Sequence, residues 1–190
     1  MTNYRLDFRT LNEAKQDIKN SHIHELDIVI RLGILYKQMT KRWPEIEPTG
    51  VDFTGGFIED DKLITSQPDF LFDHQPLEVT RADKVCVRCF HQKANKARRY
   101  LKDNNANLVF ANGYKTDSPM VLWLTPDKVT QYTDLAVKTY GTLQFRGFGY
   151  KDSYRYNLDW FKNMRWWPLP ELTEDLPETY VSLLKAVVHV

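Results

Sequence analysis

The chain has 190 residues, with 26 basic and 25 acidic side chains, and its formal net charge is +1. This length suits one domain, residues 1–190, and the near-balance of charge means that any nucleic-acid binding must use a local basic patch. No apolar run approaches the roughly 18 residues of a membrane span, and the start MTNYRLDFRT lacks a signal-peptide core, so we expect a soluble protein that is not secreted through a signal peptide. Cys86 and Cys89 are the only cysteines and suit reduced thiols, as in an intracellular protein.

The first predicted element is a helix over residues 11–42, because apolar side chains recur there at helical spacing. Ser21 is a suitable N-cap that could divide this helix in two near Asn20. Prolines 44 and 48 end the region. The segment 50–65 then favours a strand or hairpin, since it holds glycines and a charged turn.

A strand pair comes next, formed by Phe70–Phe72 and Leu77–Thr80 around a turn at residues 73–76. The pattern then changes, and residues 83–103 predict a helix that carries both cysteines. Its buried stripe would consist of Phe90, Ala94, Ala97 and Leu101.

The remaining elements are two short apolar strands, residues 107–111 and 120–124, and two helices. Thr125-Pro126 opens the first of these helices, and the second follows Pro177. This order predicts a mixed α/β domain with a central mixed sheet flanked by helices. The apolar ending SLLKAVVHV leads us to expect that the chain belongs to a larger polypeptide.

Two carboxylates stand out in this pattern, Asp69 before the first strand of the pair and Glu78 within the second. If the strands pair, the two side chains lie next to each other. Like charges so close are costly unless a cation sits between them, and oxygen ligands favour magnesium or manganese. The sequence thus indicates a metal site, although a solvated pair of acids would give the same pattern. A second Pro-Asp, at Pro126-Asp127, is explained by helix capping.

A basic helix face follows. Lys93 stands fifteen residues after Glu78, and Lys96 lies one turn later on the same face. Together, PD at 68–69, LEVTR at 77–81 and KANK at 93–96 resemble the cap-snatching endonuclease domain of segmented negative-strand RNA virus polymerases, a branch of the PD-(D/E)xK nuclease fold. The likeness is to the influenza-type PA subunit and to hantavirus-type L proteins, and it covers about residues 67–111.

The resemblance implies a catalytic lysine, Lys93, and a set of metal ligands for two manganese ions, with magnesium as the alternative. An early-helix histidine in HIHELDIV would be His24, with His22 in reserve, and imidazole would favour manganese. The second acid would be Glu47 or Asp52, between which the sequence does not decide. One ion would be held by His24, Asp69, Glu78 and the Val79 carbonyl, and the other by Asp69 and the second acid.

The implied reaction is two-metal hydrolysis of a phosphodiester bond in single-stranded capped RNA, which would supply primers for viral transcription. Candidate contacts to the RNA backbone are Arg81, Lys96, Arg98 and Arg99. The partners would be the remaining polymerase domains or subunits. The protein would be located in the cytoplasm or nucleus of the infected cell, and with the polymerase in the virion. The aromatic segment 140–167 suits a core with a docking surface better than a cap-binding stack at Trp166-Trp167.

Two other functions fit parts of the pattern. A DNA nuclease of the same broad fold, of phage or restriction type, would share Pro-Asp and Glu-x-Thr. A non-catalytic RNA-binding or docking module would keep the fold without the metals.

Overall fold

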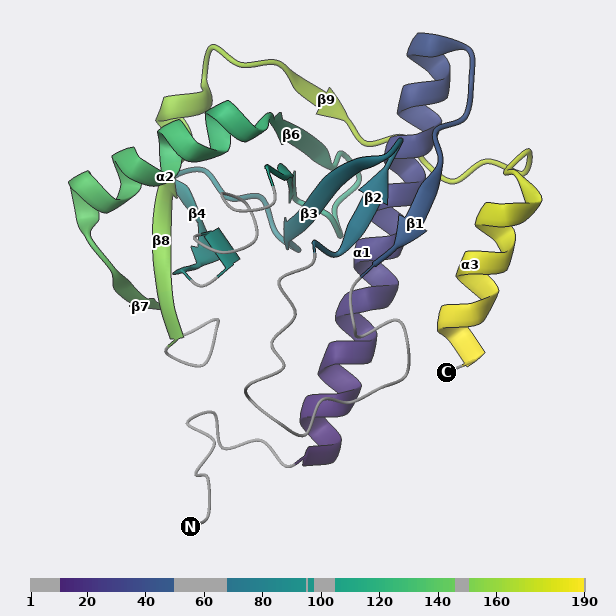
Figure 1. Cartoon of the computed structure of the whole chain (residues 1–190), viewed down its shortest axis with the longest axis horizontal. Coiled ribbons are helices and arrows are strands. Elements are labelled where there is room, and N and C mark those ends of the chain that lie inside the picture. The colour runs from purple at the N-terminus through teal and green to yellow at the C-terminus, as the bar shows by residue number, and fades with distance from the viewer. Residues whose placement is uncertain (1–10, 50–67, 95, 98–104, 146–150, 190) are drawn as a thin grey trace.

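A computed structural model describes residues 11–49, 68–94, 96–97, 105–145 and 151–189 (Figure 1). The predicted class is confirmed at the level of a mixed α/β fold with a central mixed sheet and three helices in the described part. The helices are α1 (Leu11–Thr40), α2 (Pro126–Tyr140) and α3 (Glu178–His189), with a short 3-10 helix η5 (Leu158–Phe161). Among the described helices, none combines the length and apolar character that crossing a membrane requires.

The central sheet has six strands in the order β1-β2-β3-β5-β6-β9. Its strands are β1 (Ile46–Pro48), β2 (Phe70–Phe72), β3 (Gln75–Ala82), β5 (Asn107–Asn112), β6 (Met120–Leu124) and β9 (Trp166–Pro168). Among the described strand pairs of this sheet, β3–β5 alone is parallel, and it therefore needs a crossover. On that crossover lies β4 (Cys89–Lys93), which forms a second sheet with β8 (Lys151–Asn157) and β7 (Leu143–Phe145).

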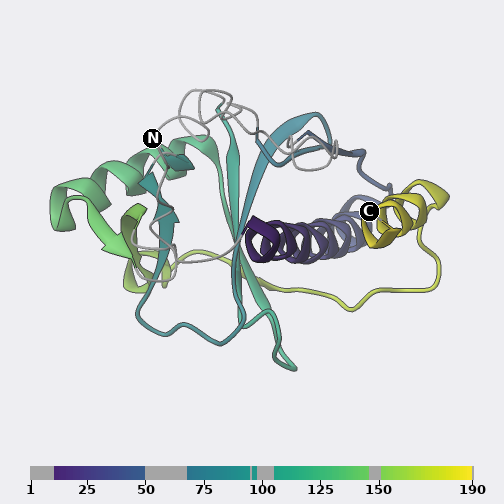
Figure 2. The same ribbon diagram turned by 90° about the horizontal axis from the view of Figure 1, so that it is seen from below.

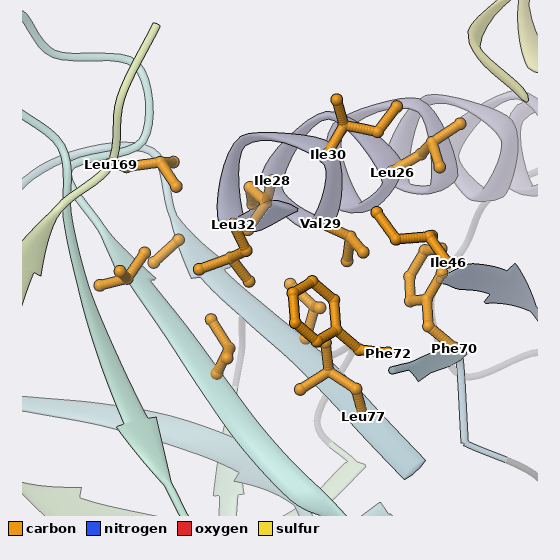
Figure 3. Close-up of a cluster of buried hydrophobic side chains, with 14 of the residues drawn as sticks. Leu26, Ile28, Val29, Ile30, Leu32, Ile46, Phe70, Phe72, Leu77 and Leu169 are labelled. Atoms are coloured by element: carbon orange, nitrogen blue, oxygen red, sulfur yellow. The ribbon is translucent and has the colours of Figure 1, made fainter. Parts of the chain in front are cut away.

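The two faces of the central sheet bury different partners (Figure 2). Helices α1 and α3 cover one face, where side chains of α1 contact Phe70 and Phe72 of β2 and Leu77 of β3 (Figure 3). On the other face, α2 and the small sheet pack around the fully buried rings of Tyr154 and Tyr156. The strands β2 and β3 thus lie between α1 and the small sheet, and their side chains can reach either.

The β2–β3 hairpin confirms the predicted strand pair, but its turn is shorter than the predicted residues 73–76. Asp73 and His74 form a two-residue loop with φ values of 51° and 66°, the left-handed conformation that such hairpins favour. The Asp73 carboxylate accepts hydrogen bonds from the Tyr36 hydroxyl at 2.7 Å and from both terminal nitrogens of Arg42 at 2.7 and 2.6 Å. These contacts attach the turn to the end of α1.

The Asp73 cluster gives a pH-dependent prediction. The hydrogen bonds from Arg42 and Tyr36 hold the pKa of Asp73 well below its usual range. A carboxyl with a lowered folded-state pKa stabilises the fold above its unfolded pKa of about 3.9, and loses that effect as the pH falls. Arg42→Ala should therefore lower the thermal midpoint by a few degrees at pH 7. The difference from wild type should shrink below about pH 3, and an unchanged difference there would contradict the assignment.

The predicted helix over residues 83–103 is wrong for residues 83–93, while residues 95 and 98–103 lie outside the described residues. Residues 83–88 form no regular element, β4 follows, and helical backbone is described only at 94, 96 and 97. The strand forms because Phe90 and Gln92 alternate into the interior, and the Phe90 ring stacks between those of Phe110 and Tyr156. Cys86 therefore lies in a loop and Cys89 begins a strand, and both are free thiols.

Other departures are smaller. Helix α1 is continuous, since the Ser21 hydroxyl donates to Glu25 at 2.9 Å instead of capping a second helix. The strand expected in residues 50–65 lies outside the described residues. The strands β1, β4, β7, β8 and β9 are additions, and β7, β8 and β9 bring part of the aromatic segment 140–167 into the two sheets.

Candidate functional site

Asp69 and Glu78 lie side by side because of the hairpin register. Phe70 pairs with Leu77 in the antiparallel ladder, so one further step places Asp69 opposite Glu78. Leu77 and Val79 belong to the core under α1, and Glu78 between them points to the opposite face, fully buried.

The ammonium group of Lys96 bridges the two carboxylates. Its Nζ atom lies 3.4 and 3.3 Å from the two Asp69 oxygens and donates a hydrogen bond to Oε1 of Glu78. The side chain of Glu78 is 1% exposed and that of Lys96 is 25% exposed, so the contact is largely shielded from water. The other Glu78 oxygen, Oε2, is buried and has no hydrogen-bond partner among the described residues.

The charges of this cluster change the acidity of its members. Burial raises the pKa of Glu78 well above its usual range, and the negative charge of Asp69 adds to the effect. Burial alone would lower the pKa of the Lys96 ammonium, but the nearby carboxylates outweigh it and leave that pKa well above the usual value. An ammonium with two acid partners is thus the cation that this site holds most readily in the absence of a metal.

Helix α1 contributes a further acid, Glu25. Burial raises the pKa of Glu25, and the charge of Asp69 raises it further, while the positive charge of Lys96 opposes both. His22 lies one turn earlier on the same helix face, with its Nδ1 atom 4.0 Å from Oε2 of Glu25. The pair His22–Glu25 therefore belongs to the same charge cluster as the two strand carboxylates.

The structure does not bring His24 to this cluster. Two residues turn a helix by about 200°, so His24 leaves α1 on the side opposite to His22. Its Nδ1 atom lies 3.3 Å from the hydroxyl of Tyr114, which donates to Asp27 at 2.8 Å. Burial, together with the charges of Arg81 and Lys115, lowers the pKa of His24.

Lys93 and Arg81 lie beside the cluster. Lys93 ends β4, and its pKa is lowered by burial and by the charge of Lys96, with Glu78 acting in the opposite direction. The guanidinium of Arg81 bonds to Asp83 and lies 5.6 Å from the ring centre of Tyr114.

The second acid is not decided by the structure. Glu47 lies exposed on β1, opposite Leu71 and on the same sheet face as Asp69. Asp52, Arg98 and Arg99 lie outside the described residues.

The hairpin register also determines which residue lies opposite Val79, whose backbone carbonyl is a predicted metal ligand. Two steps beyond Phe70–Leu77 the ladder places Pro68 opposite Val79, at a position where the two residues would exchange hydrogen bonds. Proline has no N–H group, so Pro68 offers no N–H donor to the Val79 carbonyl at this position.

The sequence pattern did not place Glu25 in the cluster, and it predicted Lys96 as a contact to the RNA backbone without predicting its position between the two carboxylates. The signal for Glu25 was its spacing of three from His22, which puts both on one helix face. No sequence signal placed Lys96 between the carboxylates. The expected helix put Lys93 and Lys96 on one face, whereas Lys93 is the last residue of a strand in the structure.

As a metal centre, the cluster has suitable donors but is not assembled around one point. Among the described residues, no three His, Cys, Asp or Glu side chains converge closely enough to hold an ion. The position between the strand carboxylates is taken by the Lys96 ammonium. Carboxylate oxygens, an imidazole and the unpartnered Oε2 of Glu78 are nevertheless ligands that suit magnesium or manganese.

Comparisons with known proteins add no relative: no family model, no curated protein and no solved structure matches the chain.

The positions of the two histidines give a prediction. If His22 is the imidazole ligand, His22→Ala should weaken manganese binding by about 10- to 100-fold, the range seen for supporting groups of metal sites. His24→Ala removes the same side chain from the opposite helix face and should change binding by less than about twofold. Isothermal titration calorimetry measures both. The reverse order would return the ligand role to His24.

Proposed function

We propose that the chain is a metal-dependent endonuclease of the PD-(D/E)xK type. The observation that carries the proposal is the meeting of Asp69, Glu78 and Lys96, which come from a loop, a strand and the segment after β4. A pair of neighbouring acids and an amine within reach of both are the groups that phosphodiester hydrolysis needs. The acid Glu25 from α1 adds a further ligand on the helix side.

The ligands in this proposal are side chains of three elements and one backbone atom. Asp69 and Glu78 would hold the ions from the hairpin, the Val79 carbonyl would add an oxygen, and Glu25 with His22 would close the site from α1. When bound, divalent cations supply positive charge that stabilises the phosphate oxygens during bond cleavage. The second acid, Glu47 or Asp52, remains part of the proposal.

Lys96 takes the catalytic role in this proposal, with Lys93 as its alternative. Its contacts with both carboxylates put an ammonium donor where a scissile phosphate would lie against the metal ligands. There it orients the phosphate and offsets the charge that develops on its oxygens. Arg81 would contact the RNA backbone near the Tyr114 ring.

The proposed substrate is single-stranded RNA, and the proposed setting is cap-snatching by a viral polymerase to which this domain belongs. This part rests on the order PD, LEVTR and KANK in the sequence. A cleavage assay tests it: with manganese present, an unstructured RNA of about 20 nucleotides should be degraded faster than duplex DNA of equal length. Faster cleavage of the duplex would favour a DNA nuclease on the same site.

An inert binding module is the second candidate, and one observation favours it. The Lys96 ammonium already offsets part of the negative charge of the two carboxylates, so the pair has a cationic partner without a metal. Calorimetry separates the two functions. The nuclease should bind manganese and lose that binding in Asp69→Asn, whereas an inert module should show no manganese binding that depends on Asp69.

A further inference from the structure

We propose that Lys96 is an internal counter-ion that a divalent cation must displace, so that metal binding releases the ammonium group for contact with the substrate phosphate. This inference deepens the proposed function and rests on it. It assigns two positions to one side chain: against Asp69 and Glu78 without metal, and outside the carboxylate pair with metal.

The first support is the geometry of the contact. One ammonium group meets three carboxylate oxygens, two on Asp69 and one on Glu78. These are oxygens that an ion held by the same two residues would use, so ammonium and ion compete for them. Both cannot keep short contacts to the same lone pairs.

The second support is the burial of Glu78. Its side chain is 1% exposed, so its ionised form needs a cationic partner. Only one of its oxygens faces Lys96, and Oε2 has no hydrogen-bond partner in the described part of the chain. The ammonium therefore satisfies the acid incompletely, and a cation that reaches both oxygens would satisfy it better.

The third support is the reach of the lysine. Its stem has four methylene groups, and 25% of the side chain is exposed, so the amine has a route outward from the carboxylates. No proton is transferred in the exchange: the ammonium keeps its charge, and the site gains the net charge of the ion. The released group then lies beside the ion, where a phosphate oxygen would bind both.

Calorimetry with manganese tests the competition. Lys96→Met keeps the apolar stem and removes the competing charge, so manganese should bind about tenfold more tightly than to wild type. Lys96→Arg, which keeps a positive charge, should bind manganese no more tightly than wild type does. Lys115→Met is the matched control, because Lys115 pairs with Asp83 at 3.1 Å and its removal should change affinity by less than about twofold.

The outcomes separate this inference from the proposed function. If wild type binds manganese and Lys96→Met binds no more tightly, the counter-ion role is overturned and the nuclease proposal stands. If neither protein binds manganese, the nuclease proposal falls, and this inference with it.

A second measurement on the wild-type chain covers the case in which Lys96→Met does not fold. Acetylation by an N-hydroxysuccinimide ester, read by mass spectrometry, reports how available each lysine amine is. Manganese should increase modification of Lys96 severalfold, because the amine leaves its two acid partners, while modification of Lys115 should stay constant. An unchanged rate at Lys96 under saturating manganese would overturn the inference.

Discussion

Glu78→Gln should abolish both manganese-induced stabilisation and RNA cleavage while the chain stays folded. The substitution keeps the shape of the side chain and removes one of the two strand carboxylates. Wild type should gain about 2.7 kcal/mol of stability at a manganese concentration about 100 times the Kd, and the variant should gain none. Cleavage should fall by about 10³-fold or more, since loss of a metal ligand removes the charge that activates the phosphate.

The metal-free variant provides a separate readout of the same residue. Burial is the largest cause of the raised pKa of Glu78, so its ionised form is costly in the folded chain. The neutral amide should therefore leave the metal-free thermal midpoint equal to that of wild type or higher. Glu45→Gln, at an exposed acid that pairs with His74, is the control and should change neither metal binding nor cleavage. Full manganese stabilisation in Glu78→Gln would remove Glu78 from the site.

Lys96→Met should lower the rate of RNA cleavage by about 10²- to 10³-fold, the loss expected when one preorganised donor to the reacting group is removed. Manganese binding should persist, because an amine is not a ligand of the ion. A variant that binds metal yet does not cleave would assign Lys96 to the substrate side of the reaction. Steady-state cleavage and calorimetry on the same preparation measure the two properties.

Lys93→Met decides between the two lysines. Its charge acts on Glu78 and Lys96, but the contacts with both carboxylates belong to Lys96. We therefore expect a smaller loss of cleavage in Lys93→Met than in Lys96→Met. If Lys96→Met cleaves normally and Lys93→Met does not, the catalytic amine is Lys93, as the sequence spacing suggested.

The acid pair could be predicted from the sequence because it depends on local rules. A two-residue turn at Asp73-His74 fixes the hairpin register, and the register alone places Asp69 opposite Glu78. No distant contact is needed for that step. The class of fold followed in the same way from the order of apolar segments.

The positions of the lysines and histidines relative to the acid pair could not be predicted because they depend on distant packing. Residues 89–93 form a strand since Phe90 stacks on rings from β5 and β8, which are far away in the sequence. The choice between His22 and His24 required knowing which face of α1 lies toward the strand acids. That face is set by Tyr114, which holds His24 on the other side.

The central claim is that Asp69 and Glu78 form a metal-dependent hydrolytic site, and the most direct test is the degradation of a short unstructured RNA with and without manganese. We predict cleavage only with manganese, loss of cleavage in Asp69→Asn, and normal cleavage in Asp127→Asn. Asp127 is the matched control because it also follows a proline but lies in the first turn of α2. Manganese-dependent cleavage that survives in Asp69→Asn, or no cleavage by the wild-type chain, would contradict the account.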